Sequence, residues 1–431
     1  MSDQPVKNPY DFVPLEGGIK RYPSTSQSGD GRSSLLLTGM LVCSLKTETP
    51  LFIGSGKGLR APSLRYIPAS SVKGAVRAVA EAVSDSCLSV VSQVYRDSHR
   101  GDLAVDIPEE YLPCANPGNP CFCCRLFGMA EGQEEERGAS GAGERKGGLG
   151  GRVHFSAAVF SGEEEEEDKE RRGGKEKGPS LMTIAFPARR TRVGRVAPAL
   201  GKPVPWHEPF YFKITEHTEH GRVPLGRKFY YHHKDYHQTI SIFSQRVKDT
   251  FVKNYLEMPV KAIKEENEFS FKVSFFDLDW DEFNVLLYSL QLESDMRHHM
   301  GMLKPFGLGS VKLKVTGIEM WSGGRFLAYE SGLGQGSEER VAWNQLEERP
   351  SNPSERAFQV DVESIQRDKV GDRAWSVGGG RPRAGEAREK LKEILRWPGE
   401  GIYLYPDYRD FFRKQDAGRI TLEEYQGGKR P

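Results

Sequence analysis

Four cysteines lie close together in the sequence, at positions suited to binding one metal ion. They are Cys114, Cys121, Cys123 and Cys124. Cys121 and Cys124 have the C-x-x-C spacing that lets two thiolates reach the same tetrahedral zinc ion, and Cys114 can supply a third. The fourth ligand is either His99 or Cys123. Structural zinc would fix an irregular segment that has no core of its own, a zinc-knuckle loop, whereas the alternative is a group of buried free thiols.

A second stretch, HHMGMLKPFGLGSVKLKV at residues 298–315, combines glycines with lysines, as phosphate-binding loops often do. It is not a P-loop or a dinucleotide fingerprint, because those glycine patterns open a helix and this stretch precedes a strand. One interpretation is a loop whose Gly307 and Gly309 let backbone amides approach a phosphate chain, with Lys304 and Lys312 at its ends. The alternative is a tight turn between a helix and a strand.

The segment IPASSVKGAVRAVAEAV at residues 67–83 predicts a helix start that could hold an anion. Ser70 or Ser71 is the expected N-cap, and free amides together with the helix dipole favour a negative group there. The basic residues of this region are Arg60, Arg65, Lys73 and Arg77. With the loop at 301–312 they could form a track for a phosphate backbone; the alternative is an ordinary capped helix with solvated basic residues.

Another basic cluster, ARRTRVGR, contains Arg189, Arg190 and Arg192 and no acidic residue. Arginine pairs bidentately with phosphate and stacks on bases, so the cluster is a candidate RNA contact. A solvated loop is the alternative. The aromatic run KFYYHH at 228–233 could stack on bases, but a strand that packs its own aromatic side chains is the favoured interpretation.

The elements that would position these residues follow from hydrophobic periodicity. Strands are expected at 34–46, 151–160, 268–278 and 310–321, and helices at 71–84 and 279–293. The order strand, helix, insertion, strand, helix, glycine-rich loop, strand predicts an α+β fold with a ferredoxin-like (RNA-recognition-like) core and large insertions.

The division of the chain follows from changes in composition. Residues 1–33 read as an N-terminal arm, residues 34–325 as the core, and residues 326–431 as a linker and a C-terminal helical extension with a helix at 385–396. Three insertions are expected in the core: a cysteine-rich and low-complexity one at 97–150, an acidic low-complexity one at 161–179, and a hairpin or lid region at 180–260. The low-complexity parts have almost no apolar residues and are expected to be disordered.

Composition sets the wider limits. The 431 residues are 37% apolar, which supports a substantial core, and 61 basic against 60 acidic residues leave a net charge of +1 that says little about partners. No apolar run is long enough to span a membrane, and the N-terminus does not resemble a signal peptide, so a cytoplasmic protein is expected. In a reducing compartment clustered cysteines favour metal binding, whereas Cys43 and Cys87 fall in strand and helix patterns and are expected in the core.

Several of these stretches resemble motifs of one family. KPFGLGSVK, after a helix and before a strand, resembles the C-terminal glycine-rich signature of the RAMP superfamily of CRISPR systems. IPASSVKGAVRAVAEAV, CFCCRLFG at 121–128 and GRVHFSAA at 151–158 resemble segments of RAMP backbone subunits in type III effector complexes. NPYDFVPL and GRKFYYHH are similar to one subgroup, and the matched pieces occur in the family's order between residues 8 and 315.

The resemblance implies a guide-RNA-binding backbone subunit of a type III CRISPR interference ribonucleoprotein, active in antiviral defence. Such subunits grip the crRNA phosphate backbone and shape the guide–target duplex. The expected partners are therefore crRNA, target RNA and other type III effector subunits. In the family a hairpin from the middle of the chain folds over the duplex, and the segment with Arg189 and Arg190 is a candidate for that role.

The same resemblance gives a reason not to expect catalysis. The family's slicing aspartate lies in the loop between the first strand and the first helix, but the corresponding residues 47–70 contain no Asp, and their one acid, Glu48, is too close to the strand. We therefore assign no catalytic residue. The alternative is a RAMP endoribonuclease that cleaves target RNA or guide precursor, with His99, His298 or His299 as general acid–base.

Overall fold

The structure is a computed structural model of the chain. It describes residues 6–22, 36–54, 66–89, 93–97, 101–130, 148–161, 178–190, 196–198, 207–250, 255–321, 340–343, 358–377, 384–406 and 419–430. Most of the two low-complexity segments lies outside these residues, as do Arg60, Arg65, His99 and Arg192. Among the described helices, none is long and apolar enough to cross a membrane.

The central sheet has nine strands in the described part of the chain, in the order β17-β18-β16-β2-β14-β7-β3, with β15 beside β16 and β6 beside β14. Its strands are β2 (Leu37–Thr47), β3 (Tyr66–Ile67), β6 (Val153–Phe155), β7 (Ala158–Phe160), β14 (Glu268–Leu278), β15 (His298–His299), β16 (Ser310–Trp321), β17 (Arg340–Ala342) and β18 (Phe358–Asp361). The alternation predicted for β14 is confirmed, because Phe269, Phe271, Val273 and Phe275 are all buried. One face of this strand therefore packs on the core.

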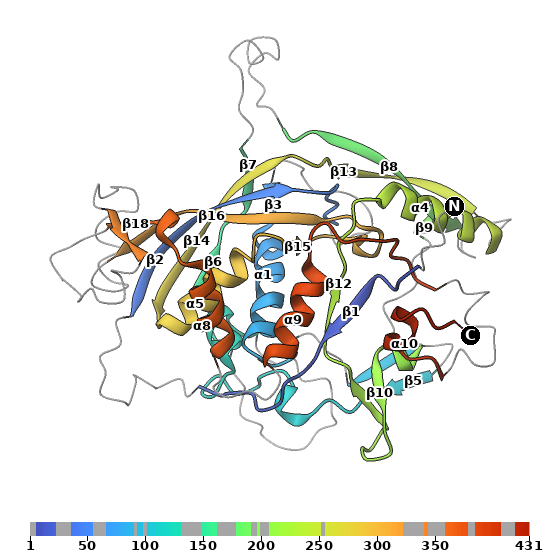
Figure 1. The fold of residues 1–431 in the computed structure, drawn as a ribbon, viewed down its shortest axis with the longest axis horizontal. Helices are drawn as coiled ribbons and strands as arrows, with labels where there is room; N and C mark the ends of the chain where they lie inside the picture. Colours follow the sequence, from blue (N-terminus) through green and yellow to red (C-terminus); the bar gives the residue numbers. More distant parts are fainter. Residues whose placement is uncertain are drawn as a thin grey trace, which may run out of the picture.

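Two helices connect the strands of this sheet. α1 (Ala69–Val83) follows β2, and α5 (Trp280–Leu290) follows β14. The pairs β16–β2, β2–β14 and β14–β7 are antiparallel. The α+β class is confirmed, and the order of elements is the β-α-β-β-α-β order expected for a ferredoxin-like core. Figure 1 shows α1 and α5 on the same side of the long strands.

The helices form where the sequence supplies an apolar stripe and a start signal. In α1, Val72, Val76, Val79 and Val83 recur on one helical face and are almost fully buried. α5 begins with a capping box in which Asp279 and Glu282 exchange side-chain and backbone hydrogen bonds. Glu282 is fully buried and lies 3.1 Å from Arg125 and 3.0 Å from Arg152. This ion-pair group fixes the cysteine-rich segment to the start of α5.

A second, three-stranded sheet comes from the region at 180–260. It contains β8 (Leu181–Arg190), β9 (Val196–Pro198) and β13 (Tyr255–Ile263), in the order β13-β8-β9, and α4 (Tyr236–Thr250) packs on β8. Its apolar face contacts the glycine-rich loop: the rings of Phe186 on β8 and Phe306 are 5.1 Å apart. The loop is thereby fixed between the two sheets.

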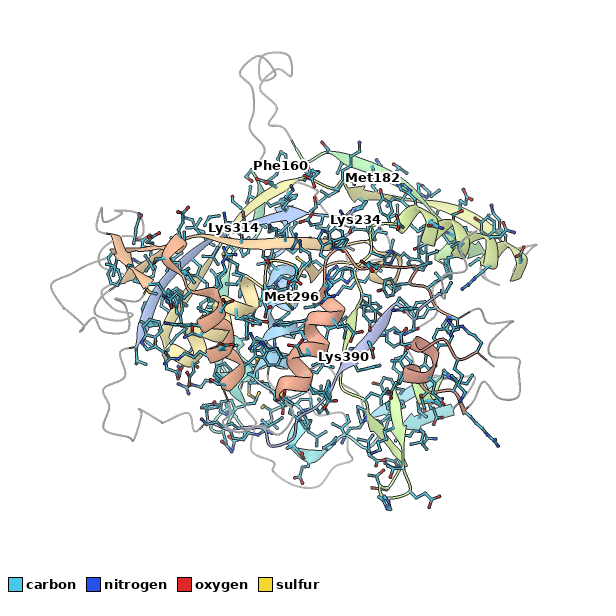
Figure 2. All side chains as sticks on the ribbon, viewed as in Figure 1. Phe160, Met182, Lys234, Met296, Lys314 and Lys390 are labelled. Atoms are coloured by element: carbon cyan, nitrogen blue, oxygen red, sulfur yellow. The ribbon has the colours of Figure 1, made fainter. Side chains whose placement is uncertain are left out.

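Both ends of the chain pack on the core helices. β1 (Tyr10–Val13) pairs with β12 (Arg227–Tyr230), and α9 (Ala384–Leu395) contacts both strands. Lys390 on α9 lies 2.7 Å from Asp11 on β1, and Figure 2 shows Lys390 beside that strand. The C-terminal region, predicted as a linker and a helical extension, packs on the core. α8 (Arg367–Ser376) packs on α5, β18 extends the sheet, and Leu391 and Ile394 are fully buried.

The remaining elements surround the cysteine-rich segment and one end of the fold. They are β4 (Val94–Asp97), β5 (Gly101–Ala104), α2 (Phe122–Phe127), β10 (Phe212–Ile214), β11 (Arg222–Pro224) and α10 (Leu422–Gln426). β4 pairs with β5 and β10 pairs with β11, in two short hairpins. α2 contacts α1, which brings the cysteine-rich segment against the first core helix.

Candidate functional site

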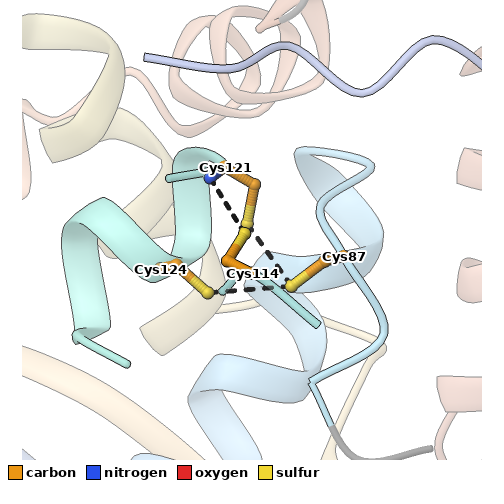
Figure 3. A group of neighbouring side chains, drawn as sticks. All are labelled: Cys87, Cys114, Cys121 and Cys124. Atoms are coloured by element: carbon orange, nitrogen blue, oxygen red, sulfur yellow. Dashed lines mark hydrogen bonds between the residues drawn. The ribbon is translucent and has the colours of Figure 1, made fainter. Parts of the chain in front are cut away.

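Four cysteine thiols meet at the end of α1, next to α2. The Sγ atoms of Cys87, Cys114, Cys121 and Cys124 all lie within 4.8 Å of one another. Figure 3 shows the four side chains converging, with Cys87 Sγ 3.7 Å from Cys124 Sγ and 3.6 Å from Cys121 Sγ. In a tetrahedral site with zinc–sulfur bonds of about 2.3 Å, neighbouring sulfurs are about 3.8 Å apart. The four cysteines therefore have the separations needed to hold one metal ion.

Three of these cysteines were predicted from their spacing, but the fourth was not. Cys87, which was expected only in the core, takes that place, while His99 lies outside the described residues. Cys123 is not a member of the group: its Sγ lies 3.4 Å from Ser84 Oγ, and its backbone amide donates to Ser86 Oγ. Since consecutive residues of a helix point about 100° apart, Cys123 and Cys124 in α2 cannot face the same ion.

Two arginines donate to the cysteine sulfurs from outside the group. Arg21 Nη1 lies 2.7 Å from Cys114 Sγ, and Arg77 Nη2 lies 3.6 Å from Cys124 Sγ. Such donors stabilise the negative charge of thiolates around a metal. Arg77 also pairs with Glu81 and donates to the Gly128 carbonyl oxygen. An RNA-contacting role was expected for Arg77, but its donor groups are used within the protein.

Lys73, like Arg77, uses its side-chain donor within the protein. Its Nζ donates to the Phe127 carbonyl oxygen at 2.9 Å, which ties the C-terminal end of α2 to α1. Burial, and then the charge of Arg77, lower the pKa of Lys73. Lys73 and Arg77, the pair predicted to face RNA, thus hold the cysteine segment against α1 in this structure.

The start of α1 differs from the expected serine cap. Pro68 is the N-cap and makes no side-chain cap hydrogen bond, so Ser70 and Ser71 lie inside the first turn. The serine-cap prediction is therefore wrong, because the chain enters the helix two residues earlier than the periodicity suggested. The first turn also contains no acidic residue. Among the described residues no side chain caps its amides, which leaves the helix start suited to an anion.

Three glycines of the glycine-rich loop adopt the left-handed backbone conformation, with positive φ angles, that other residues rarely adopt. Gly301, Gly307 and Gly309 have φ angles of +74°, +84° and +84°, and a Cβ at Gly309 would collide with the Met300 carbonyl oxygen. The amides of Gly307 and Gly309 donate to the carbonyl oxygens of Lys304 and Pro50. The first of these hydrogen bonds closes the turn, and the second ties the loop to the segment after β2, as the alternative interpretation of a tight turn requires.

The start of α1 and the glycine-rich loop nevertheless meet at one cavity of about 540 Å³, which we name the α1–loop cavity. Ser70, Ser71 and Gly74 line it from the helix, and Gly301, Met302 and Lys304 line it from the loop. Lys228 and Tyr230 on β12 form a third side. The predicted convergence of the two elements is thus present. Lys312 does not line this cavity and is exposed on β16.

Two lysines in this cavity have no acidic partner among the described residues. Lys228 Nζ lies over three tyrosine rings, at 3.7 Å from the centre of Tyr10, 5.1 Å from Tyr211 and 5.0 Å from Tyr230. Burial lowers the pKa of Lys228 to about 7 and also lowers the pKa of Lys304. Buried ammonium groups without a counter-ion are unfavourable, so both lysines favour an anionic ligand.

A model of the RAMP superfamily matches residues 44–312, more than half of the chain. The chain belongs to the RAMP superfamily. The match runs from β2 into β16 and includes both sides of the α1–loop cavity and all four clustered cysteines. Membership makes the protein a CRISPR-associated RNA-binding module. Comparison with curated proteins finds no match.

Three histidines of this RAMP protein, His232, His298 and His299, lie at or next to the cavity. His299 lines it, and Ser310 Oγ lies 3.3 Å from His299 Nε2 and 2.7 Å from His232 Nδ1. Burial, followed by the charges of neighbouring groups, lowers the pKa of His299 well below its ordinary value. His298 is also buried, and burial lowers its pKa to about 4. Both imidazoles are therefore neutral near pH 7.

The predicted arginine contacts lie elsewhere in the RAMP fold. The backbone of Arg189 and Arg190 forms the end of β8, opposite Tyr255 on β13 and Val196 on β9 respectively. Glu48, the one acid of the first loop, lies 2.9 Å from Arg297. The sequence interpretation missed Lys228, although the lysine stands directly before an aromatic run, which was the only local signal for it.

Proposed function

We propose that this RAMP protein is a guide-RNA-binding backbone subunit of a type III CRISPR ribonucleoprotein in the cytoplasm. It grips the crRNA phosphate backbone and shapes the guide–target duplex in antiviral defence, together with other type III subunits. The observation that carries the proposal is the α1–loop cavity, where two lysines without acidic partners in the described structure face an uncapped helix start.

The physical argument is one of charge. Lys228 and Lys304 lose hydration in the cavity, and no described carboxylate compensates them, so a phosphate would replace the missing partner. The first turn of α1 adds amide dipoles of the same sign. Contacts of this kind recognise the backbone rather than the bases, which suits a subunit that must bind guides of different sequence.

The other proposed RNA contacts remain predictions. They are Ser70 and Ser71 at the cavity, Arg60, Arg65, Arg189, Arg190 and Arg192 along the track, and Lys312 on β16. Lys73 and Arg77 contribute indirectly in this proposal, because they hold α2 against the helix that lines the cavity.

We further propose that the ion held by the cysteine cluster is structural zinc. Four thiolates favour zinc among the common cellular metals, and a set of four protein ligands leaves no position for a substrate. When bound, zinc supplies a cross-link between the end of α1 and α2. Cys87, Cys114, Cys121 and Cys124 would hold it, with Arg21 and Arg77 as outer donors.

The experiment that tests RNA binding compares Lys304→Glu with Lys369→Glu. Lys369 is exposed on α8, outside the α1–loop cavity and away from the proposed RNA contacts, so its reversal makes the same change of charge elsewhere. Affinity for a labelled guide RNA is measured over a range of salt concentrations. We expect Lys304→Glu to weaken binding at least about tenfold and to reduce the salt slope by about one phosphate contact. Equal effects of the two variants would refute the proposal.

His299 favours a second candidate function, a RAMP endoribonuclease acting on target RNA or guide precursor. Its neutral imidazole lines the same cavity as the two lysines, where it could accept a proton from a ribose 2′-hydroxyl. The test incubates labelled precursor and guide-paired target with the protein, with and without divalent metal. Cleavage that survives chelation and is lost in His299→Ala supports the enzyme, whereas binding without cleavage supports the backbone subunit.

A further inference from the structure

We propose that a second cavity, continuous with the α1–loop cavity and lined by tyrosines, receives a nucleobase of the bound RNA. The inference rests on the proposed RNA binding and adds to it a site for a base. We name this second space, of about 520 Å³, the tyrosine cavity. Its volume lies within the range of about 300–1,000 Å³ that small-molecule sites occupy.

The two cavities share one side and follow one another along α1. Five residues line both cavities: Gly74, Ala78, Lys228, Phe229 and Tyr230. The α1–loop cavity begins at Ser70, and the tyrosine cavity extends to Glu81, which is about 16 Å further along the helix. Small residues at the shared positions of α1 leave room for a continuous trough between this helix and β12.

The walls of the tyrosine cavity suit a flat aromatic ligand. Tyr95 on β4, Tyr211 and Phe212 line it, and Tyr211 is supported from behind by Tyr10, whose ring centre is 5.3 Å away. Every base has a π-face that can stack on such rings, so this binding tolerates different sequences. The chemistry therefore agrees with a subunit that holds guides of many sequences.

The charges at the two ends give the ligand a direction. Lys228 lies at the boundary with the α1–loop cavity, and Glu81 lies at the other end. Glu81 is paired with Arg77 at 2.9 Å, and Arg77 also donates to the Gly128 carbonyl oxygen and to Cys124 Sγ. Arg227, which also lines this cavity, donates to Asp85 and to the Ser86 carbonyl oxygen, so the described residues offer no unengaged arginine there. A carboxylate repels phosphate but accepts N–H groups of a base. The phosphate consequently lies at Lys228 and the base extends towards Glu81.

Photo-crosslinking of the full-length protein tests the inference. Guide RNAs that carry a single 4-thiouridine at successive positions are bound, irradiated and digested, and the crosslinked peptides are identified by mass spectrometry. We expect crosslinks to Tyr95 or Tyr211 from particular positions of the guide. Crosslinks that map only outside the tyrosine cavity would overturn the proposal.

Variants of Tyr95 give an independent measurement. Tyr95→Ala should weaken guide RNA binding roughly 5- to 100-fold, whereas Tyr95→Phe, which keeps the ring, should bind guide RNA as tightly as the wild type. Tyr66→Ala is the matched control, because Tyr66 is an exposed tyrosine on β3 that lines neither cavity. Equal affinities for Tyr95→Ala and the wild type would overturn the inference.

The outcomes separate this inference from the proposed function. If Lys304→Glu leaves RNA affinity unchanged, the proposed function itself fails. If binding depends on Lys304 but neither the crosslinks nor Tyr95→Ala involve the tyrosine cavity, only the base site fails. Free adenosine and uridine 5′-monophosphates form a further arm, since their binding as tightly as the guide RNA would assign the cavity to free nucleotides and overturn the proposal.

Discussion

Replacing Cys87 by serine tests the metal site at the residue that the sequence did not predict. The wild-type chain should bind one zinc ion, and Cys87→Ser should bind it far more weakly, because a serine hydroxyl does not supply a thiolate. Cys87 Sγ lies within 3.7 Å of both Cys121 Sγ and Cys124 Sγ, so its loss opens one corner of the tetrahedron.

The size of the effect follows from the four-thiolate geometry. Structural zinc sites bind with apparent free energies of about 10–16 kcal/mol, so one of four equivalent ligands contributes roughly 3 kcal/mol. This corresponds to a loss of roughly 150-fold in zinc affinity. The cross-link between α1 and α2 should weaken with it, and the melting temperature of the variant should no longer respond to added zinc.

The assay measures zinc per chain by atomic emission after dialysis against chelators of increasing strength. Cys123→Ser is the matched control, since it makes the same change of thiol to hydroxyl at the residue next to Cys124 in α2. Cys123 Sγ contacts Ser84 instead of the cluster, so this variant should retain its zinc. Loss of zinc from Cys123→Ser together with retention in Cys87→Ser would refute the geometric reasoning.

Three further results are expected. Gly309→Ala should lower the free energy of unfolding by at least about 2 kcal/mol in denaturant titrations, because its methyl group would collide with the Met300 carbonyl oxygen at a positive φ angle. Glu282→Ala should lower it by about 3–5 kcal/mol, since two arginines lose their buried partner; a loss below 1 kcal/mol would contradict this. Burial lowers the pKa of Lys228 from 10.5 to about 7, so between these values the unfolded chain binds more protons than the folded protein, and the free energy of unfolding rises with pH. Lys228→Met should remove that part of the rise in denaturant titrations at pH 7 and 9, and an unchanged pH dependence would show that the lysine is not buried as described.

The sequence predicted those elements whose pattern is local. β14 follows from strict alternation, and α1 follows from apolar residues that recur on one helical face. Cys114, Cys121 and Cys124 were recognised because their spacing alone allows three ligands to reach one ion. The glycines of the loop were recognised as a turn signal, although not for the hydrogen bonds that their amides make.

Other features depend on contacts between residues far apart in the chain. Cys87 reaches the cluster because α1 ends beside α2. Lys228 meets Tyr10 because β12 pairs with β1, and no spacing rule relates these two residues. The same holds for α9, whose place in the core, with Leu391 fully buried, depends on contacts with β1 and β12.

The sequence by itself thus determined the α+β class, the family resemblance and three of the four clustered cysteines, because periodicity and short spacings are set by local geometry. Only the tertiary structure decided that Lys73 and Arg77 are engaged inside the protein while Lys228 and Lys304 line a cavity. The physical reason is that the availability of a charge depends on which acceptors folding brings to it. Apart from Glu81, four residues from Arg77 on α1, those acceptors come from distant segments of the chain.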